Sequence, residues 1–275
     1  MFLLSGSDFP NDNATLREAL AGSLLPLGIK APALFLDGDF PSFSGIRIDL
    51  SGAYFQRGYR IPSASSEVKE SFFARYLEIK AAPAKFESLP FRVLLQADDC
   101  VFAVGTTEKN ERVGTLRKCS GGTLEIAASI ADIEATLLAL AAEAASGFGA
   151  SVDSIRIVAE AATPRSVAIT ATAVAKAFMT KATLTLRGRL DVDEHHCARL
   201  SEITCTGDGM IANLAAGQLR PRFAEWERLS FPLANVLPEG LAISDLALTA
   251  GSELKVRAAI QSARARTPDQ DAPEV

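Results

Sequence analysis

Hydrophobic and polar residues alternate in many short stretches of this chain, and the alternation predicts β-strands. In residues 43–50, three apolar side chains alternate with Arg47 and Asp49, a period of two that is typical of a strand with one solvated face. The same alternation recurs in residues 77–80, 91–95, 155–157, 184–192 and 254–261. Because polar residues interrupt every run, we expect antiparallel, half-exposed strands, since strands of a parallel sheet have continuous apolar runs.

Two stretches with apolar residues at helical spacing are expected to form a short one-sided helix and a long kinked helix. The first can be capped by Asn13 and runs to about Leu25, with apolar residues on one side only. The other begins at Asp208 and ends near Leu229, and it contains Pro221. Proline removes one backbone donor, so a kink is expected within this helix.

A third helical stretch lies in the middle of the chain and is apolar nearly all round. Ser129 and Asp132 can form a variant of the capping box at its start, and the apolar residues continue to Phe148. A helix without a polar face must be covered on most sides. We therefore expect it to lie inside a curved sheet.

The order of these elements predicts an α+β fold with long helices packed on a strongly curved antiparallel β-sheet. We expect a single domain over residues 1–262. Its helix-and-strand halves, at about residues 1–150 and 151–262, also suggest a loose internal duplication. Residues 263–275 lose the apolar periodicity and carry two prolines and several acids, so they are expected to form a disordered tail.

Composition and charge exclude several classes of protein. The 275 residues are 48% hydrophobic with a formal net charge of −5, which excludes a disordered chain, a collagen-like fibre and a strongly basic nucleic-acid-binding protein. The first residues lack the positive region of a signal peptide, and no apolar run is long enough for a transmembrane helix. The expected location is cytoplasmic by default, and no nucleic acid partner is expected.

The residues best suited to chemistry gather in residues 193–197, which contain both histidines, His195 and His196, next to Cys197. Adjacent residues on a strand point to opposite faces and no third histidine is available, so we interpret the cluster as a polar turn without a metal. The chain has no G-x-S-x-G elbow and no phosphate-binding glycine motif. We therefore expect no catalytic residues, no enzyme activity and no cofactor.

The four cysteines do not form a C-x-x-C pair. If residues 96–104 and 113–126 form a hairpin, Cys100 and Cys119 lie opposite each other, because each is equally far from the turn. They can then be either a cross-strand disulfide or two buried thiols. The disulfide status of Cys197 and Cys205 is left open in the same way.

Five segments in the second half of the chain resemble a known family. They are 186–192 (LRGRLDV), 207–214 (GDGMIANL), 219–221 (LRP), 231–233 (FPL) and 241–246 (LAISDL), followed by a last alternating strand. In their order along the chain and in their residue pattern, they resemble the LmeA-like phospholipid-binding family. That family is catalogued as a domain of unknown function and is similar to the tubular lipid-binding (TULIP) superfamily. The resemblance covers about half the chain. It implies a long helix wrapped by a curved sheet, with acyl chains between them, and it implies no catalytic motif.

The resemblance and the apolar helices together predict non-enzymatic binding or transport of an amphiphile, a phospholipid or a fatty acyl chain, in an apolar groove. Each buried methylene of such a chain would contribute about 0.8 kcal/mol. The alternative is a structural or interaction protein with a filled core and no ligand. The groove candidates are Leu137, Leu138, Leu140, Ala141, Phe148, Ile211, Leu214, Phe223 and Trp226.

A stretch of aromatic and cationic residues is the candidate for a transient membrane contact. Aromatic rings beside positive charges can form the rim of a protein at a membrane surface. The alternative is that the rings pack inward while the charges stay solvated. The rim candidates are Tyr54, Phe55, Arg57, Tyr59 and Arg60.

Overall fold

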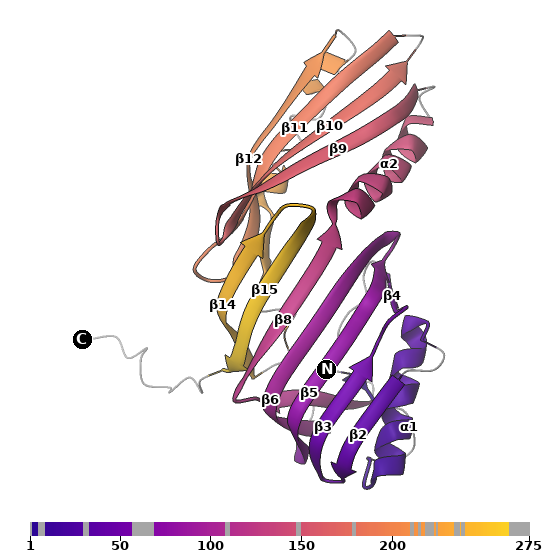
Figure 1. Cartoon of the computed structure of the whole chain (residues 1–275), viewed down its shortest axis with the longest axis vertical. Coiled ribbons are helices and arrows are strands. Elements are labelled where there is room, and N and C mark those ends of the chain that lie inside the picture. The colour runs from indigo at the N-terminus through magenta and orange to yellow at the C-terminus, as the bar shows by residue number, and fades with distance from the viewer. Residues whose placement is uncertain are drawn as a thin grey trace, which may run out of the picture.

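Two β-sheets lie end to end along the long axis of the molecule (Figure 1). This arrangement comes from a computed structural model. It describes residues 2–4, 9–29, 33–56, 69–107, 111–146, 150–177, 180–209, 212–213, 216–217, 223, 225–233, 237 and 240–263. The tail expected at residues 263–275 falls outside the described residues from position 264 onward.

The large sheet has ten described strands, in the order β14, β15, β8, β6, β5, β3 and β2, with β1, β4 and β7 attached at the side. Neighbours are antiparallel, except that β5 pairs in parallel with β3 and with β4. The bounds are β1 (Phe2–Leu3), β2 (Ala33–Asp39), β3 (Ser42–Asp49), β4 (Tyr54–Phe55), β5 (Lys69–Phe86), β6 (Leu89–Thr106), β7 (Arg112–Lys118), β8 (Gly121–Ser129), β14 (Leu241–Thr249) and β15 (Glu253–Ser262).

The expected hairpin around the first two cysteines is present. β7 and β8 follow each other along the same edge of β6, so that Val101 pairs with Lys118 and Asp98 pairs with Gly121. The break between β7 and β8 lies at residues 119–120, and the register on both sides places Cys119 opposite Cys100. Both thiols are buried and free.

The first helix, α1 (Asn13–Leu24), packs on one face of the large sheet and fills its core. Its cap is Asp12, whose side chain accepts from the backbone N–H of Thr15 at 2.8 Å. The cap is thus one residue earlier than expected, and the Asn13 side chain instead accepts from the N–H of Phe40 at 2.7 Å. A 3-10 turn, η1 (Leu25–Leu27), follows the helix. The most buried residues of this core include Leu16, Phe43, Ile46, Leu77 and Cys100.

The small sheet has five described strands in the order β13, β12, β11, β10 and β9, all antiparallel. One face is apolar, and helical residues Ala216, Phe223 and Trp226 pack on it. The opposite face is polar and carries a row of paired threonines from three strands. The bounds are β9 (Ala150–Thr163), β10 (Ser166–Ala177), β11 (Thr180–Val192), β12 (Cys197–Asp208) and β13 (Ser230–Pro232).

The two sheets share a second core where they meet. β14 and β15 return from the small sheet to pair beside β8, and the N–H of Leu248 donates to the carbonyl of Pro164 at 2.6 Å. The last strands of the chain therefore belong to the large sheet. The buried residues of this junction are Ala159, Val167, Val192, Leu246, Leu248 and Ala258.

The expected fold class, with long helices packed on a strongly curved antiparallel sheet as in the TULIP superfamily, is wrong. The protein is mostly β-strand in two sheets, with short helices among the described residues. The mid-chain helix, α2 (Ile130–Ser146), has 17 residues, and not one of them is buried. It lies beside the outer strand β9 instead of inside a sheet (Figure 1). Its first residue, Ile130, packs against the core between the two sheets. The other residues of the two cores come from α1 and the sheets.

Candidate functional site

α2 starts directly from the last residue of β8, and its first turn is fixed by the expected capping box. The Ser129 hydroxyl donates to the Asp132 carboxylate at 2.7 Å, and the backbone N–H of Asp132 donates to the Ser129 hydroxyl at 3.0 Å. The N–H of Ile130 donates to the carbonyl of Ser252 at 2.9 Å. The start of the helix is therefore held both by its own side chains and by the turn before β15.

One stripe of α2 faces β9 and is anchored there by Glu134. One carboxylate oxygen of Glu134 accepts from the backbone N–H of Ile157 at 2.7 Å, and the other lies 3.5 Å from the Arg156 guanidinium. Further along the same stripe, Leu138 and Ala141 are half-buried. The helix is thus attached to the small sheet by a polar contact and a row of partly covered apolar side chains.

The neighbouring flank of α2 is apolar and open. Leu137 and Leu140 are 39% and 53% exposed, Ala144 is exposed and Ile133 is half-buried. These four residues follow one another at spacings of four, three and four, which places them on one side of the helix. We call them the leucine flank. It contains both of the large hydrophobic side chains that α2 leaves exposed, Leu137 and Leu140.

The groove candidates lie in two separate places. Leu137, Leu138, Leu140 and Ala141 are on α2, beside β9. Phe223 is buried on the small sheet with its ring centroid 5.6 Å from that of Trp226. Their shared core includes residues of β11 and β12 and contains no α2 residue. Phe148, Ile211 and Leu214 lie outside the described residues.

The membrane-rim candidates are only partly described. Tyr54 is exposed on the short strand β4. Phe55 is half-buried, and its ring centroid lies 5.9 Å from that of Phe91 on β6. Arg57, Tyr59 and Arg60 lie outside the described residues. Of the two described aromatics, one thus packs inward and one faces solvent.

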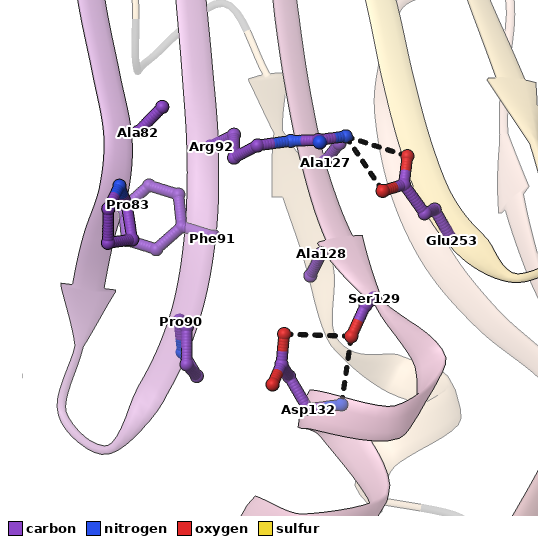
Figure 2. Close-up of a pocket in the computed structure, with 10 residues that line it drawn as sticks. All are labelled: Ala82, Pro83, Pro90, Phe91, Arg92, Ala127, Ala128, Ser129, Asp132 and Glu253. Atoms are coloured by element: carbon purple, nitrogen blue, oxygen red, sulfur yellow. Dashed lines mark hydrogen bonds and ion pairs between the residues drawn. The ribbon is translucent and has the colours of Figure 1, made fainter.

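An open notch of about 450 Å³ lies where β5, β6 and β8 meet the start of α2 (Figure 2). The Arg92 side chain extends across β8 over Ala127, and Nη2 lies 2.8 and 2.7 Å from the two carboxylate oxygens of Glu253. Ser129 and Asp132 bond each other at the far side. Because the polar groups mostly bond one another, the notch offers a ligand little that would orient it.

A second cavity of about 400 Å³ adjoins the notch on the solvated face of the large sheet. Two of its lining residues, Glu78 and Gln96, form a bonded triad with Tyr76: Tyr76 Oη donates to Glu78 at 2.8 Å, and the Gln96 amide donates to both. These bonds, first from Tyr76 and then from Gln96, lower the pKa of Glu78 below its ordinary value. Burial, with a smaller contribution from Glu78, raises the pKa of Tyr76.

The turn at residues 193–197 is polar, as the sequence predicted. Asp193 accepts from the backbone N–H groups of His195 and Cys197 at 3.0 and 2.8 Å. His196 has a positive φ of 58°. In the described part of the chain, no group of three or more histidine, cysteine, aspartate or glutamate side chains is arranged to hold a metal ion.

Sequence reasoning missed a polar network around Asp191. Its two carboxylate oxygens accept from the hydroxyls of Ser166 at 2.6 Å and of Ser201 at 2.5 Å, and Arg189 lies 3.5 Å away. Burial alone would raise the pKa of Asp191, but these hydroxyls lower it below its ordinary value. The alternation of residues in β11 predicts only on which face of the sheet Asp191 lies. Its hydrogen-bond partners come from two other strands, β10 and β12, and alternation within one strand cannot predict them.

Comparisons with protein-family models, curated proteins and solved structures find no match to this chain. The resemblance to the LmeA-like family therefore stays a prediction. Among the described residues, no helix has both the length and the apolar character needed to cross a membrane. The candidate site rests on the geometry of the chain itself, and the leucine flank of α2 is its best-defined feature.

Proposed function

We propose that this protein is a non-enzymatic interaction protein that binds an apolar helix of a protein partner through the leucine flank. The observation that supports this proposal is the exposure of Leu137 and Leu140, on a helix with no buried residue. Covering the exposed part of each leucine would contribute about 1 kcal/mol. Exposed apolar patches on soluble proteins often mark interaction sites.

The spacing of the flank favours a helical partner. Ile133, Leu137, Leu140 and Ala144 follow the alternation of four and three residues with which helices pack side by side. A partner helix with leucines at the same spacing could insert its side chains between them. The alanines around the flank allow close approach of the two backbones.

The charges of α2 favour a protein partner over a membrane surface. Asp132, Glu134 and Glu143 are its only charged residues, and all are acidic. Helices that lie on membranes are instead rich in lysine and arginine on their polar face. Amphiphile binding stays a prediction, and the experiment below includes an arm for it.

A second exposed apolar group lies on β12 and after the helical segment. Leu200, Leu229 and Phe231 are exposed there. Residues 218–222 and 234–236, which are near them in sequence, lie outside the described residues. The proposal therefore rests on α2, whose described residues are continuous from 130 to 146.

The polar clusters support binding more than catalysis. The carboxylate of Asp191 is bonded to two serine hydroxyls, and Asp193 is bonded to the backbone of its own turn. In catalytic sites, by contrast, a nucleophile and a base face a common cavity. Neither carboxylate lines the notch or the adjoining cavity.

The test uses the full chain and a labelled helical peptide with leucines at alternating spacings of three and four and glutamine at the flanking positions. We expect saturable binding by fluorescence anisotropy, and a loss of about tenfold or more in Leu137→Gln/Leu140→Gln, since each leucine contributes about 1 kcal/mol. The matched control is Ala135→Gln/Ala142→Gln, which changes exposed positions on the other flank of the same helix. It is expected to bind as the wild type does.

The outcomes separate the alternatives. All variants should unfold within about 0.5 kcal/mol of the wild type, since surface substitutions rarely do more. A peptide that does not bind, or that binds both double variants equally, contradicts the proposal. Flotation with phosphatidylcholine vesicles that is lost in Leu137→Gln/Leu140→Gln would show that the flank meets an amphiphile instead.

A further inference from the structure

We infer that the partner of the leucine flank is a basic amphipathic helix whose positive charges lie next to the C-terminal end of α2. The inference rests on the proposed function and adds the charge of the partner to it. It follows from the way the acidic residues of α2 are distributed and used. The N-terminal acids have partners within the protein, whereas the C-terminal acid has none in the part of the chain that the structure describes.

At the N-terminal end, both acidic side chains already have partners. Asp132 accepts from the Ser129 hydroxyl. Glu134 accepts from the N–H of Ile157 and lies 3.5 Å from Arg156, whose side chain is 81% exposed. Asp132 also lies in the first turn, where the positive end of the helix dipole opposes its charge. This end of the flank therefore gives a partner less electrostatic preference than the other end.

At the C-terminal end, the acidic side chain of α2 has no partner among the described residues. The last turn of α2 contains no basic residue of its own, so within the helix no cation offsets the negative end of the dipole. Glu143 adds a full charge in the same turn, three residues after Leu140. Its carboxylate has no hydrogen bond or ion pair with other described residues. Lysine or arginine on a partner helix would meet both the carboxylate and the dipole.

The same charges disfavour a second copy of this chain as the partner. Two α2 helices packed through their leucine flanks would bring only acidic helix side chains together. The nearest basic side chain known to contact α2, Arg156, is already paired with Glu134. A basic helix thus complements this flank better than the flank complements itself.

The experiment compares three peptides with the same leucine seam but with lysine, glutamine or glutamate at the flanking positions. With the full wild-type chain at low salt, we expect the lysine peptide to bind about two- to fivefold more tightly than the glutamine peptide. The glutamate peptide should bind more weakly than both. The differences should shrink as salt is raised, because exposed charges are screened.

Glu143→Lys should reverse the order of affinity for the three peptides, and Glu143→Gln should reduce the preference for the lysine peptide. The matched charge change is Glu194→Lys, at the exposed turn between β11 and β12, which should keep the wild-type order. If the glutamine peptide binds but charge makes no difference, the inference is overturned and the proposed function stands. If no peptide binds, the proposed function itself fails.

Sedimentation of the wild type and Leu140→Gln at graded concentrations tests whether a second copy of the chain occupies the flank. The wild type is expected to remain a monomer at the concentrations used for the peptides. A dimer that dissociates in Leu140→Gln would show that a second copy occupies the flank. That result would overturn the inference of a basic partner.

Discussion

The carboxylate of Glu134 on α2 accepts a hydrogen bond from the backbone N–H of Ile157 on β9, at 2.7 Å. β9 is the outer strand of the small sheet. At the outer strand of the large sheet, Arg17 of α1 donates to the carbonyl of Leu34 on β2, at 2.6 Å. At one of its two edges, each sheet therefore has a strand whose backbone is bound by a helix side chain, which hinders pairing of that edge with strands of other molecules.

The contact between Glu134 and Ile157 predicts that truncating the glutamate side chain lowers the stability of the protein. Glu134→Ala should lower the free energy of unfolding by about 1–3 kcal/mol, because it leaves the N–H of Ile157 without its charged acceptor. Glu134→Gln keeps an acceptor and should lose less. Hydrogen exchange at the Ile157 amide should accelerate in the alanine variant.

The control for this prediction is Glu143→Ala on the same helix, whose side chain is exposed. It should change the free energy of unfolding by no more than about 0.5 kcal/mol. Equal losses in Glu134→Ala and Glu143→Ala, measured by urea unfolding, would mean that the contact with Ile157 contributes nothing to stability.

A tight approach between three strands predicts that Gly122 cannot be replaced. Gly122 lies on β8 between Ala97 on β6 and Ile260 on β15. A Cβ at this position would lie 2.6 Å from the carbonyl oxygen of Gln96 and 3.0 Å from side-chain atoms of Ala97 and Ile260. Gly122→Ala should therefore cost about 1–3 kcal/mol of stability.

The neighbouring glycine is the matched control. A Cβ at Gly121 would meet no atom within 4 Å, so Gly121→Ala should be neutral or stabilise by up to about 1 kcal/mol through the unfolded state. Thermal unfolding of both variants tests this difference, and Gly122→Ala should melt at the lower temperature. Similar melting temperatures would contradict the close packing of Gly122.

Much of the local structure could be predicted from the sequence. The alternation of apolar and polar residues found β3, β11 and β15, because the period of two depends only on neighbours in the chain. The capping box of Ser129 and Asp132 is local in the same way and is confirmed. The pairing of β15 with β8 joins residues more than a hundred positions apart, and periodicity carries no information on such a contact.

The surroundings of α2 could not be predicted for a related reason. The helix is apolar nearly all round, and this pattern predicts burial. Seven of its 17 residues are alanines, such as Ala135 and Ala142, and a small side chain loses little when it stays exposed. Periodicity reports what a helix could bury. It does not report whether the sheets leave room for it.

The bonded triad around Glu78 predicts a loss of stability in acid. Hydrogen bonds from Tyr76 and Gln96 lower the pKa of Glu78 in the folded protein below its ordinary value of 4.5. The folded state therefore gains stability above pH 4.5, and the gain is lost as the pH falls through the lowered folded value. Urea unfolding between pH 3 and pH 6 measures this slope.

Two variants check the assignment of that slope. Glu78→Gln removes the titrating group and should flatten the dependence of the free energy of unfolding on pH in this window. Tyr76→Phe removes the strongest of the bonds to Glu78. The pKa of Glu78 in the folded protein should therefore rise, and part of the slope should disappear. An unchanged slope in both would place the acid sensitivity elsewhere in the chain.

The burial of Cys100 predicts which thiols react in the folded protein. Burial, and then the neighbouring Cys119, raises the pKa of Cys100 to about 12, and burial also raises the pKa of Cys119. Only the thiolate attacks a disulfide reagent, so at pH 8 both thiols should be protonated as well as shielded. Cys197 is half-buried in a surface turn and should react first, whereas Cys205 is buried.

Ellman's reagent should therefore label Cys197 alone in the native protein and all four cysteines after unfolding without a reductant. Two thiols missing from the unfolded protein, with Cys100 and Cys119 unlabelled by mass spectrometry, would show a disulfide between them.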